Sequence, residues 1–126
     1  MDQYGEQIVT HSRFFSTEFN TAIIDGPLRI YFADRQESDA LQIYFSIQEA
    51  LAENGLKLEA LPLQTPNIFL MMYPNKESFQ DVFDVEQDIA VDRFGDHGIF
   101  GISGPCRDEI RKRVSQRISD DLASFK

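Results

Sequence analysis

The fold is decided by the stretch Asn67–Tyr73, which reads NIFLMMY. Almost every residue in it is apolar, as is typical of a strand covered on both faces. Pro74 and Asn75 follow directly and break the run. The stretch therefore predicts a central, buried strand, and the neighbouring segments are interpreted outward from it.

Two earlier segments have the composition of strands. Residues 21–24 form a β-type run, and Asp25-Gly26-Pro27 is a turn signal because Gly tolerates positive φ and Pro fixes its own. Residues 28–33 follow as a second, alternating strand. The alternation predicts one side with Leu28, Ile30 and Phe32, and another with Arg29 and Tyr31.

A long helix is predicted between these strands and the central one. Ser38 or Asp39 would cap its start, and Gly55 would end it after Asn54. Its apolar stripe is expected to contain Ala40, Leu41, Tyr44, Phe45, Ile47, Gln48 and Leu51. The next segment, residues 56–61, alternates and predicts a modest strand that Pro62 would confine to an edge.

The second half of the chain predicts two helices around one strand. Asn75 would cap a short helix, and the acidic stretch through Asp96 would continue as helix ending in loop. Residues 99–102 are expected to be the last strand, and residues 103–105 to open the final helix with Pro105 at its first position. The apolar face of that helix would comprise Ile110, Val114, Ile118, Leu122 and Phe125.

The resulting order predicts an α+β fold. Without the first short run it is βαββαβ plus a C-terminal helix, which matches a ferredoxin-like sandwich. The alternative is a small α/β fold with a mixed sheet and helices on both faces. Residues 1–19 are expected to form an N-terminal arm that docks through Phe14, Phe15 and Phe19, and residues 20–126 to form a single domain.

Charge and composition restrict the function classes. The net charge of −9 disfavours nucleic acid and membrane surfaces as partners. One Cys among 126 residues suits a reducing compartment. The N-terminus lacks the apolar core of a secretory signal, and no run approaches the ~20 apolar residues of a membrane span. The expected location is the cytoplasm.

The charges are unevenly distributed along the chain. Residues 77–96 hold seven acids against Arg93, whereas residues 107–117 hold five cations against two acids. The basic segment predicts a docking face for an acidic partner, or for the acidic segment of a second copy in a homodimer. The expected contact residues are Arg107, Arg111, Lys112 and Arg117.

A glycine series, Gly95, Gly98, Gly101 and Gly104, precedes the final helix. Such glycines either make tight turns or let a backbone approach a ligand, with Gly101, Ser103 and Gly104 as the candidate ligand-binding residues. Cys106 would lie in the first turn of a helix, where a thiol pKa is lowered. A nucleophilic cysteine needs a base, and the weak candidates are therefore His97 and Cys106, with His11 as another possible base.

Complete catalytic and cofactor motifs are absent from the sequence. The acidic run fails as a calcium loop because Ile89 and Gly95 stand where Gly and Glu are needed. A phosphatase loop would need Arg at position 112, which is Lys112, and Ser103 lacks the glycine that follows a nucleophile elbow. No metal site and no cofactor is predicted.

The function that these observations favour is that of a non-enzymatic, cytoplasmic protein-interaction or regulatory module. It would act through the basic face of the C-terminal helix and the acidic segment, on a partner protein or on itself. The alternative is a small enzyme or small-ligand sensor with its site in the Gly-rich loop 95–106.

Overall fold

The structure is a computed structural model that describes residues 13–104 and 106–125. Its strands are β1 (Thr21–Asp25), β2 (Leu28–Phe32), β3 (Ile68–Met72), β4 (Ile89–Phe94) and β5 (His97–Ile102). Its α-helices are α2 (Glu37–Ala52), α3 (Lys76–Val82) and α4 (Arg107–Phe125). Two 3-10 turns are η1 (Asp34–Gln36) and η2 (Leu58–Ala60).

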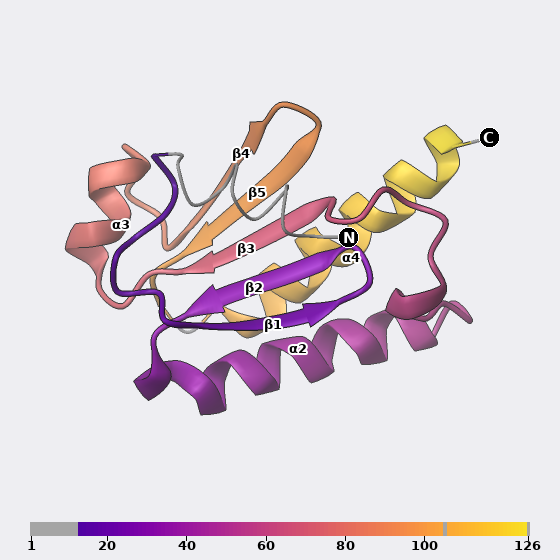
Figure 1. The fold of residues 1–126 in the computed structure, drawn as a ribbon, viewed down its shortest axis with the longest axis horizontal. Helices are drawn as coiled ribbons and strands as arrows, with labels where there is room; N and C mark the ends of the chain where they lie inside the picture. Colours follow the sequence, from indigo (N-terminus) through magenta and orange to yellow (C-terminus); the bar gives the residue numbers. More distant parts are fainter. Residues whose placement is uncertain (1–12, 105, 126) are drawn as a thin grey trace.

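The strands form one mixed sheet in the order β1-β2-β3-β5-β4 (Figure 1). The three middle strands, β2, β3 and β5, run parallel to one another. The two edge strands, β1 and β4, pair antiparallel with their neighbours through tight hairpins. The predicted central strand is confirmed as β3, and all five of its residues are buried.

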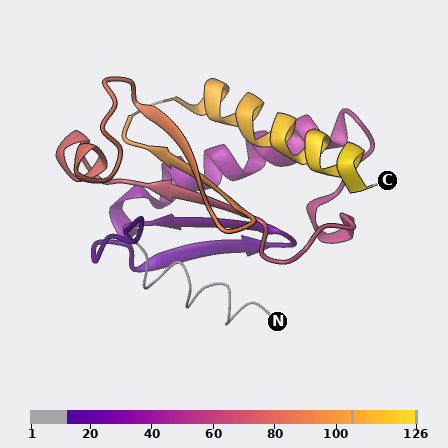
Figure 2. The same ribbon diagram turned by 90° about the horizontal axis from the view of Figure 1, so that it is seen from above.

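One face of the sheet is covered by the two long helices, α2 and α4, which lie side by side (Figure 2). The core between the sheet and these helices is almost entirely aliphatic. It follows the period-two pattern of the strands, because alternate residues point to the same face. This confirms that Leu28, Ile30 and Phe32 share one side of β2, and that Ile110, Val114 and Ile118 form the buried face of α4.

The other face carries an aromatic core. Tyr31, Phe69 and Tyr73 come from the parallel strands, and Phe79 comes from α3. The covering segment before β1 adds Phe14 and Phe19, both buried, with Phe15 partly buried beside them. The expected docking of these three rings is confirmed, whereas residues 1–12, with His11, lie outside the described residues.

The strand predicted at residues 56–61 is wrong. That segment forms η2, with Leu58 buried against the aliphatic core and Leu61 packed beside it. Its alternation reflects a single turn that covers one end of the core. The α+β class is confirmed, but the ferredoxin-like order is not, because it needed this strand. The described residues form the mixed sheet that was the alternative.

The helix predicted through Asp96 is also wrong beyond Val82. Residues 89–94 form β4, which pairs with β5 across a two-residue turn in which Gly95 has a φ of 61°. Only the first part of the acidic stretch is helical, as α3. Its cap is confirmed, since the Asn75 Oδ1 accepts a hydrogen bond from the Ser78 amide at 2.8 Å.

Two helix starts differ from the expectation. The long helix α2 begins at Glu37, ahead of Ser38 and Asp39, and continues directly from η1. The final helix begins at Arg107, so Cys106 occupies the cap position and its carbonyl accepts the first helical hydrogen bond, from the Ile110 amide. Pro105, which was expected at the first helical position, lies outside the described residues.

Candidate functional site

The described part of the chain forms two hollows that are large enough to receive a ligand. The first, here called the end cleft, has a volume of about 850 Å³ and lies at the carboxyl ends of β2, β3 and β5. Ligands of open α/β sheets commonly bind outside these strand ends, because side chains and backbone groups of several loops converge there. The lining residues are Arg35, Gln36, Asp39, Gln42, Ile43, Met72, Tyr73, Pro74, Ile102, Ser103, Gly104, Cys106, Arg107, Asp108 and Glu109.

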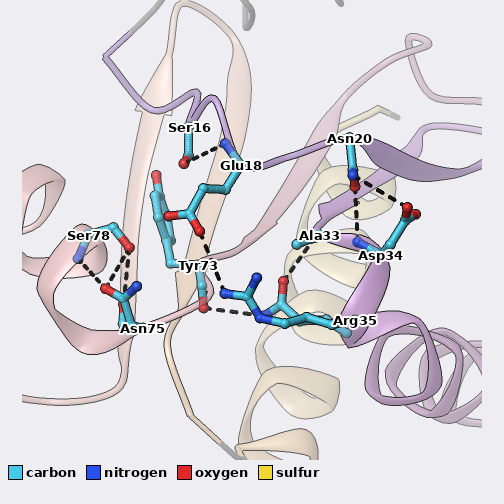
Figure 3. A network of polar contacts seen from close by, with 10 residues as sticks. Ser16, Glu18, Asn20, Ala33, Asp34, Arg35, Tyr73, Asn75 and Ser78 are labelled. Atoms are coloured by element: carbon cyan, nitrogen blue, oxygen red, sulfur yellow. Dashed lines mark hydrogen bonds and ion pairs between the residues drawn. The ribbon is translucent and has the colours of Figure 1, made fainter.

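A polar network holds the loops of this end of the sheet together (Figure 3). Gln36 accepts a hydrogen bond from the Ala33 amide at 2.9 Å and donates one to the Tyr73 carbonyl at 3.3 Å. Asp34 accepts hydrogen bonds from Thr21 and Asn20. These side chains therefore form hydrogen bonds with one another and with the backbone. Through Gln36 and Tyr73, the network holds one wall of the end cleft in place.

Tyr73 links this network to the aromatic core. Its carbonyl faces Gln36, while its hydroxyl donates a hydrogen bond to the Phe14 carbonyl at 2.6 Å. Burial raises the pKa of the Tyr73 hydroxyl above its usual value. The phenol is thus a neutral structural donor, directed away from the end cleft.

The end cleft brings together four of the sequence-predicted site residues, Ser103, Gly104, Cys106 and Arg107. It does not include His97, which is the first residue of β5, whereas Cys106 follows the end of that strand. A strand of this length separates its ends by roughly 15–20 Å. The structure therefore gives Cys106 no base in His97.

The environment of Cys106 also differs from that of an activated thiol. Burial raises the pKa of the Cys106 thiol, and the nearby carboxylates of Asp88 and Glu109 act in the same direction. Backbone hydrogen bonds at Gly104 and Cys106 act against them but do not outweigh burial. The thiol itself donates to the Gly104 carbonyl at 3.2 Å, which favours the protonated form. The thiol is protonated near neutral pH, which is the opposite of what nucleophilic catalysis needs.

Ser103 is tied to the start of β4. Its amide donates to the Asp88 carbonyl at 3.0 Å, and its hydroxyl lies 3.3 Å from the Asp88 carboxylate. Lys76 donates to the same carboxylate at 2.9 Å and lowers the pKa of Asp88. Ser103 is thus neither the helix cap nor an elbow nucleophile; it helps to fasten the loop between α3 and β4.

The basic face of α4 is largely engaged inside the molecule. Arg111 donates to the Ser46 carbonyl at 3.2 Å and pairs with Glu53 at 3.2 Å, so it joins α4 to α2. Arg117 is paired with Asp121 at 2.7 Å. These contacts leave little of either guanidinium for a partner, and the role of this face in binding stays a prediction.

The other two predicted contact residues are more open. Arg107 is exposed and donates to the Gln42 side chain at 3.0 Å. Lys112 is exposed. Both lie in the first part of α4, but only Arg107 lines a hollow, the end cleft.

Two glycines of the series are explained by packing. A Cβ at Gly101 would overlap the ring of Phe83, which rests on the aromatic face of β5. A Cβ at Gly98 would overlap the Arg117 guanidinium on the opposite face. A side chain already fills the space above each of these glycines, so Gly101 is not open to a ligand on that face, while Gly104 remains in the lining of the end cleft.

The second hollow, here called the edge groove, has a volume of about 840 Å³ and follows the edge strand β4. Consecutive residues from Gln87 to Asp92 line it, and strand side chains alternate between faces. The groove therefore runs along the edge of the sheet and opens to both faces. Its remaining lining comes from Arg13, residues 82–85, Cys106, Glu109 and Arg113.

The edge groove is not evident from the sequence. Its apolar lining includes Val82, Val85 and Val91, and Val91 is 51% exposed. The available signal was the run of strand-forming residues at 89–91 within the acidic segment. The run at residues 89–91 can be recognised as an edge strand only when its pairing with β5 is known.

The described residues contain neither a cluster of metal-ligating side chains nor a helix that could span a membrane. Within residues 13–104 and 106–125, no group of three or more His, Cys, Asp or Glu side chains is arranged to hold a metal ion. The helices of the same part of the chain are too short or too polar to cross a membrane.

Comparison with models of known protein families, with characterised proteins and with solved structures finds no match for this chain. The two hollows, and the chemistry of the residues that line them, are therefore the features that indicate a function.

Proposed function

We propose that this domain is a non-enzymatic module that binds a partner protein through the edge groove. The observation that carries the proposal is the apolar hollow along β4, where Val91 is exposed beside a strand edge that no other described strand covers. Exposed apolar surface of this kind, rimmed by charged residues, is typical of sites where proteins bind one another.

The acidic segment and the C-terminal helix meet at this groove. One wall contains Asp84, Asp88 and Asp92, and the other contains Glu109 and Arg113 of α4. The two segments that the charge distribution singled out thus contribute to the same surface. The contact area proposed here lies beside the predicted basic face and is centred on β4. The single cysteine suits a reducing compartment, so we place the protein in the cytoplasm.

A photo-crosslinking amino acid at position 91 tests this proposal. In cells that produce the full chain, we expect a discrete crosslinked product from position 91. The matched control is position 24 in the other edge strand, since Ile24 is 53% exposed and likewise apolar. Products of equal yield at both positions, or no product at position 91, would overturn the proposal.

A small-ligand sensor is the second candidate, and the end cleft favours it because it lies at the carboxyl ends of three parallel strands. Thermal unfolding against nucleotides and small anions tests it. A ligand at ~100 times its dissociation constant adds about 2.7 kcal/mol to the free energy of unfolding. The midpoint shift should disappear in R107A if the ligand occupies the end cleft.

If the second candidate were an enzyme, its nucleophile would be Cys106. We expect the Cys106 thiol to react slowly with alkylating agents. Because its pKa is raised, alkylation by iodoacetamide at pH 7 should be slower than for an exposed free thiol, and should accelerate as the pH rises. The rate is followed by mass spectrometry of the intact chain. Alkylation faster than that of glutathione would support Cys106 as a catalytic nucleophile.

A further inference from the structure

We infer that the partner contributes an extended, positively charged segment that joins the sheet as a sixth strand beside β4. This inference rests on the proposed function and adds the mode of binding and the chemistry of the occupant. Addition of a strand to an exposed sheet edge is a recurrent way to recognise a peptide, in which backbone hydrogen bonds provide affinity and alternate side chains provide specificity.

The backbone of β4 has the correct phase for this addition. In an antiparallel pair, hydrogen-bonded residues alternate along the strand. The Ser103 amide donates to the Asp88 carbonyl, so Asp88, Ala90 and Asp92 direct their peptide groups toward β5. The N–H and C=O groups of Ile89 and Val91 therefore point out of the sheet, into the edge groove.

The row of outward-pointing backbone groups ends at Arg93. Its amide donates to the Asp92 carboxylate at 2.8 Å instead of pointing to an open edge. The Ile89 and Val91 peptide groups thus form a short docking edge, bounded at one end by this side-chain cap. An added strand would pair over these residues and leave the β4–β5 turn free.

Walls on both sides of β4 would receive the side chains of the added strand. Val91 lies opposite Phe100 and so faces the helix-covered side, where Glu109 and Arg113 form the wall. Asp92 lies opposite Ile99 and faces the aromatic side, where Val82 and Val85 form the other wall. Alternate residues of the guest strand would contact these walls in turn.

The charge of the lining favours a basic occupant. Four carboxylates line the groove, Asp84, Asp88, Asp92 and Glu109, against the two guanidinium groups of Arg13 and Arg113. Three of the four are already ion-paired, Asp92 with Arg13, Glu109 with Arg113 and Asp88 with Lys76, so the excess negative charge lies at Asp84. Asp84 is exposed and makes no ion pair with another described residue. A lysine or arginine in the guest would complement this excess, and the protein's net charge of −9 would steer it.

The same charge disfavours a second copy of this chain as the occupant. Antiparallel pairing of β4 with itself would bring together two segments that each hold seven acids between residues 77 and 96. Like charges placed at an interface suppress association. We therefore assign the groove to a basic segment of another protein.

Two short synthetic peptides test the inference directly. One alternates valine and lysine, and the other alternates valine and glutamate. Binding to the full chain is measured by fluorescence anisotropy at low salt, and amide hydrogen exchange follows residues 89 and 91. We expect the lysine peptide to bind about tenfold tighter or more than the glutamate peptide, and to slow exchange at Ile89 and Val91 but not at Ile24.

Backbone substitutions separate strand addition from simple charge attraction. N-methylation of alternate residues of the lysine peptide removes its hydrogen-bond donors on one edge and leaves its charge, and should weaken binding about tenfold. V91P removes the outward N–H of β4 and should have a similar effect, while I24P on the other edge strand is the matched control. Edge strands tolerate proline where the N–H faces solvent.

The outcomes distinguish the inference from the proposed function. If position 91 crosslinks to a partner but the N-methylated and plain peptides bind equally, the groove binds protein without strand addition and the inference is overturned. If the glutamate peptide binds as tightly as the lysine peptide, the assigned charge is wrong. If the chain instead dimerises and V91P makes it monomeric, the occupant is a second copy. The N-methylated peptide keeps the test valid even if V91P fails to fold.

Discussion

The two faces of the sheet are built from different side chains and covered in different ways. On one face, aliphatic residues such as Leu70 pack under two long helices. On the other, aromatic residues such as Phe69 pack under a helix of two turns and an irregular segment before β1. Phe69 and Leu70 are adjacent in β3 and both fully buried, so one residue step separates the two environments.

This difference shows how the covers are held in place. Long amphipathic helices cover the aliphatic face through their apolar stripes, which needs few polar contacts. The cover of the aromatic face is short, and it relies on ring contacts together with hydrogen bonds such as that from Tyr73 to Phe14. The edge groove lies beside this second, more irregular cover.

The largest expected loss of stability comes from truncating one buried core residue on each face of the sheet. We expect F69A and L70A each to lower the free energy of unfolding by about 3–5 kcal/mol, because each leaves a cavity in a fully buried site. The comparison is sharpened by hydrogen exchange. F69A should loosen α3 and the segment around Phe19, whereas L70A should loosen α2 and α4.

Chemical denaturation provides the free energies, and V91A is the control at an exposed position in the same sheet. If both variants increased hydrogen exchange at the same amides, the two cores would unfold as a single cooperative unit. The two faces would then not differ in how their covers are stabilised.

A smaller effect is expected where the aromatic cover meets the sheet. G101A places a Cβ against the ring of Phe83 and should cost about 1–3 kcal/mol through overpacking. Thermal unfolding of G101A, F83L and the double variant forms a cycle. The double variant should lose less stability than the sum of the two single variants, because the smaller leucine makes room. Strict additivity would show that the ring contact is not the cause.

The smallest effect on stability is expected from the ion pair between Lys76 and Asp88, which holds the loop before β4. Lys76 lowers the pKa of Asp88 from its ordinary value of 3.8, so this contact stabilises the folded state above about pH 4. The stabilisation is lost as the pH falls through the lowered pKa, when the carboxylate is protonated. K76M should therefore unfold slightly earlier than the natural chain at pH 6. The difference should shrink toward pH 2, where only the Lys76 hydrogen bonds to the Glu86 and Gln87 carbonyls remain to be lost.

Thermal unfolding midpoints from pH 6 to pH 2 check this expectation, with D88N expected to behave like K76M. The contact is exposed, so a difference of more than a few degrees at pH 6 would contradict its assignment as a surface ion pair.

Much of the fold could be predicted from local signals. The buried strand at residues 68–72, the hairpin around Gly26, and the Asn75 cap follow from composition, turn residues and side-chain chemistry, and all three are confirmed. The strand at residues 56–61 failed because a single 3-10 turn with Leu58 inward has the same short alternation. The helix through Asp96 failed because β4 has a partner, β5, that local patterns cannot supply.

The candidate site could be predicted only in part. Three of the candidate site residues, Ser103, Gly104 and Cys106, line the end cleft together because they are close along the chain, and their role in binding or catalysis stays a prediction. The distance between His97 and Cys106 was not accessible, since it depends on β5 being extended between them. The internal ion pair of Arg111 with Glu53 likewise depends on how α4 packs on α2.

The sequence by itself determined which segments are apolar on one side, where the chain turns, and that the molecule is strongly acidic. These properties depend on residues near one another in the chain. Only the tertiary structure decided which strand lies at the edge, which charges are neutralised internally, and that β4, residues 82–85 and α4 enclose a groove. Those features depend on contacts between residues far apart in the sequence, which form only when the sheet is assembled.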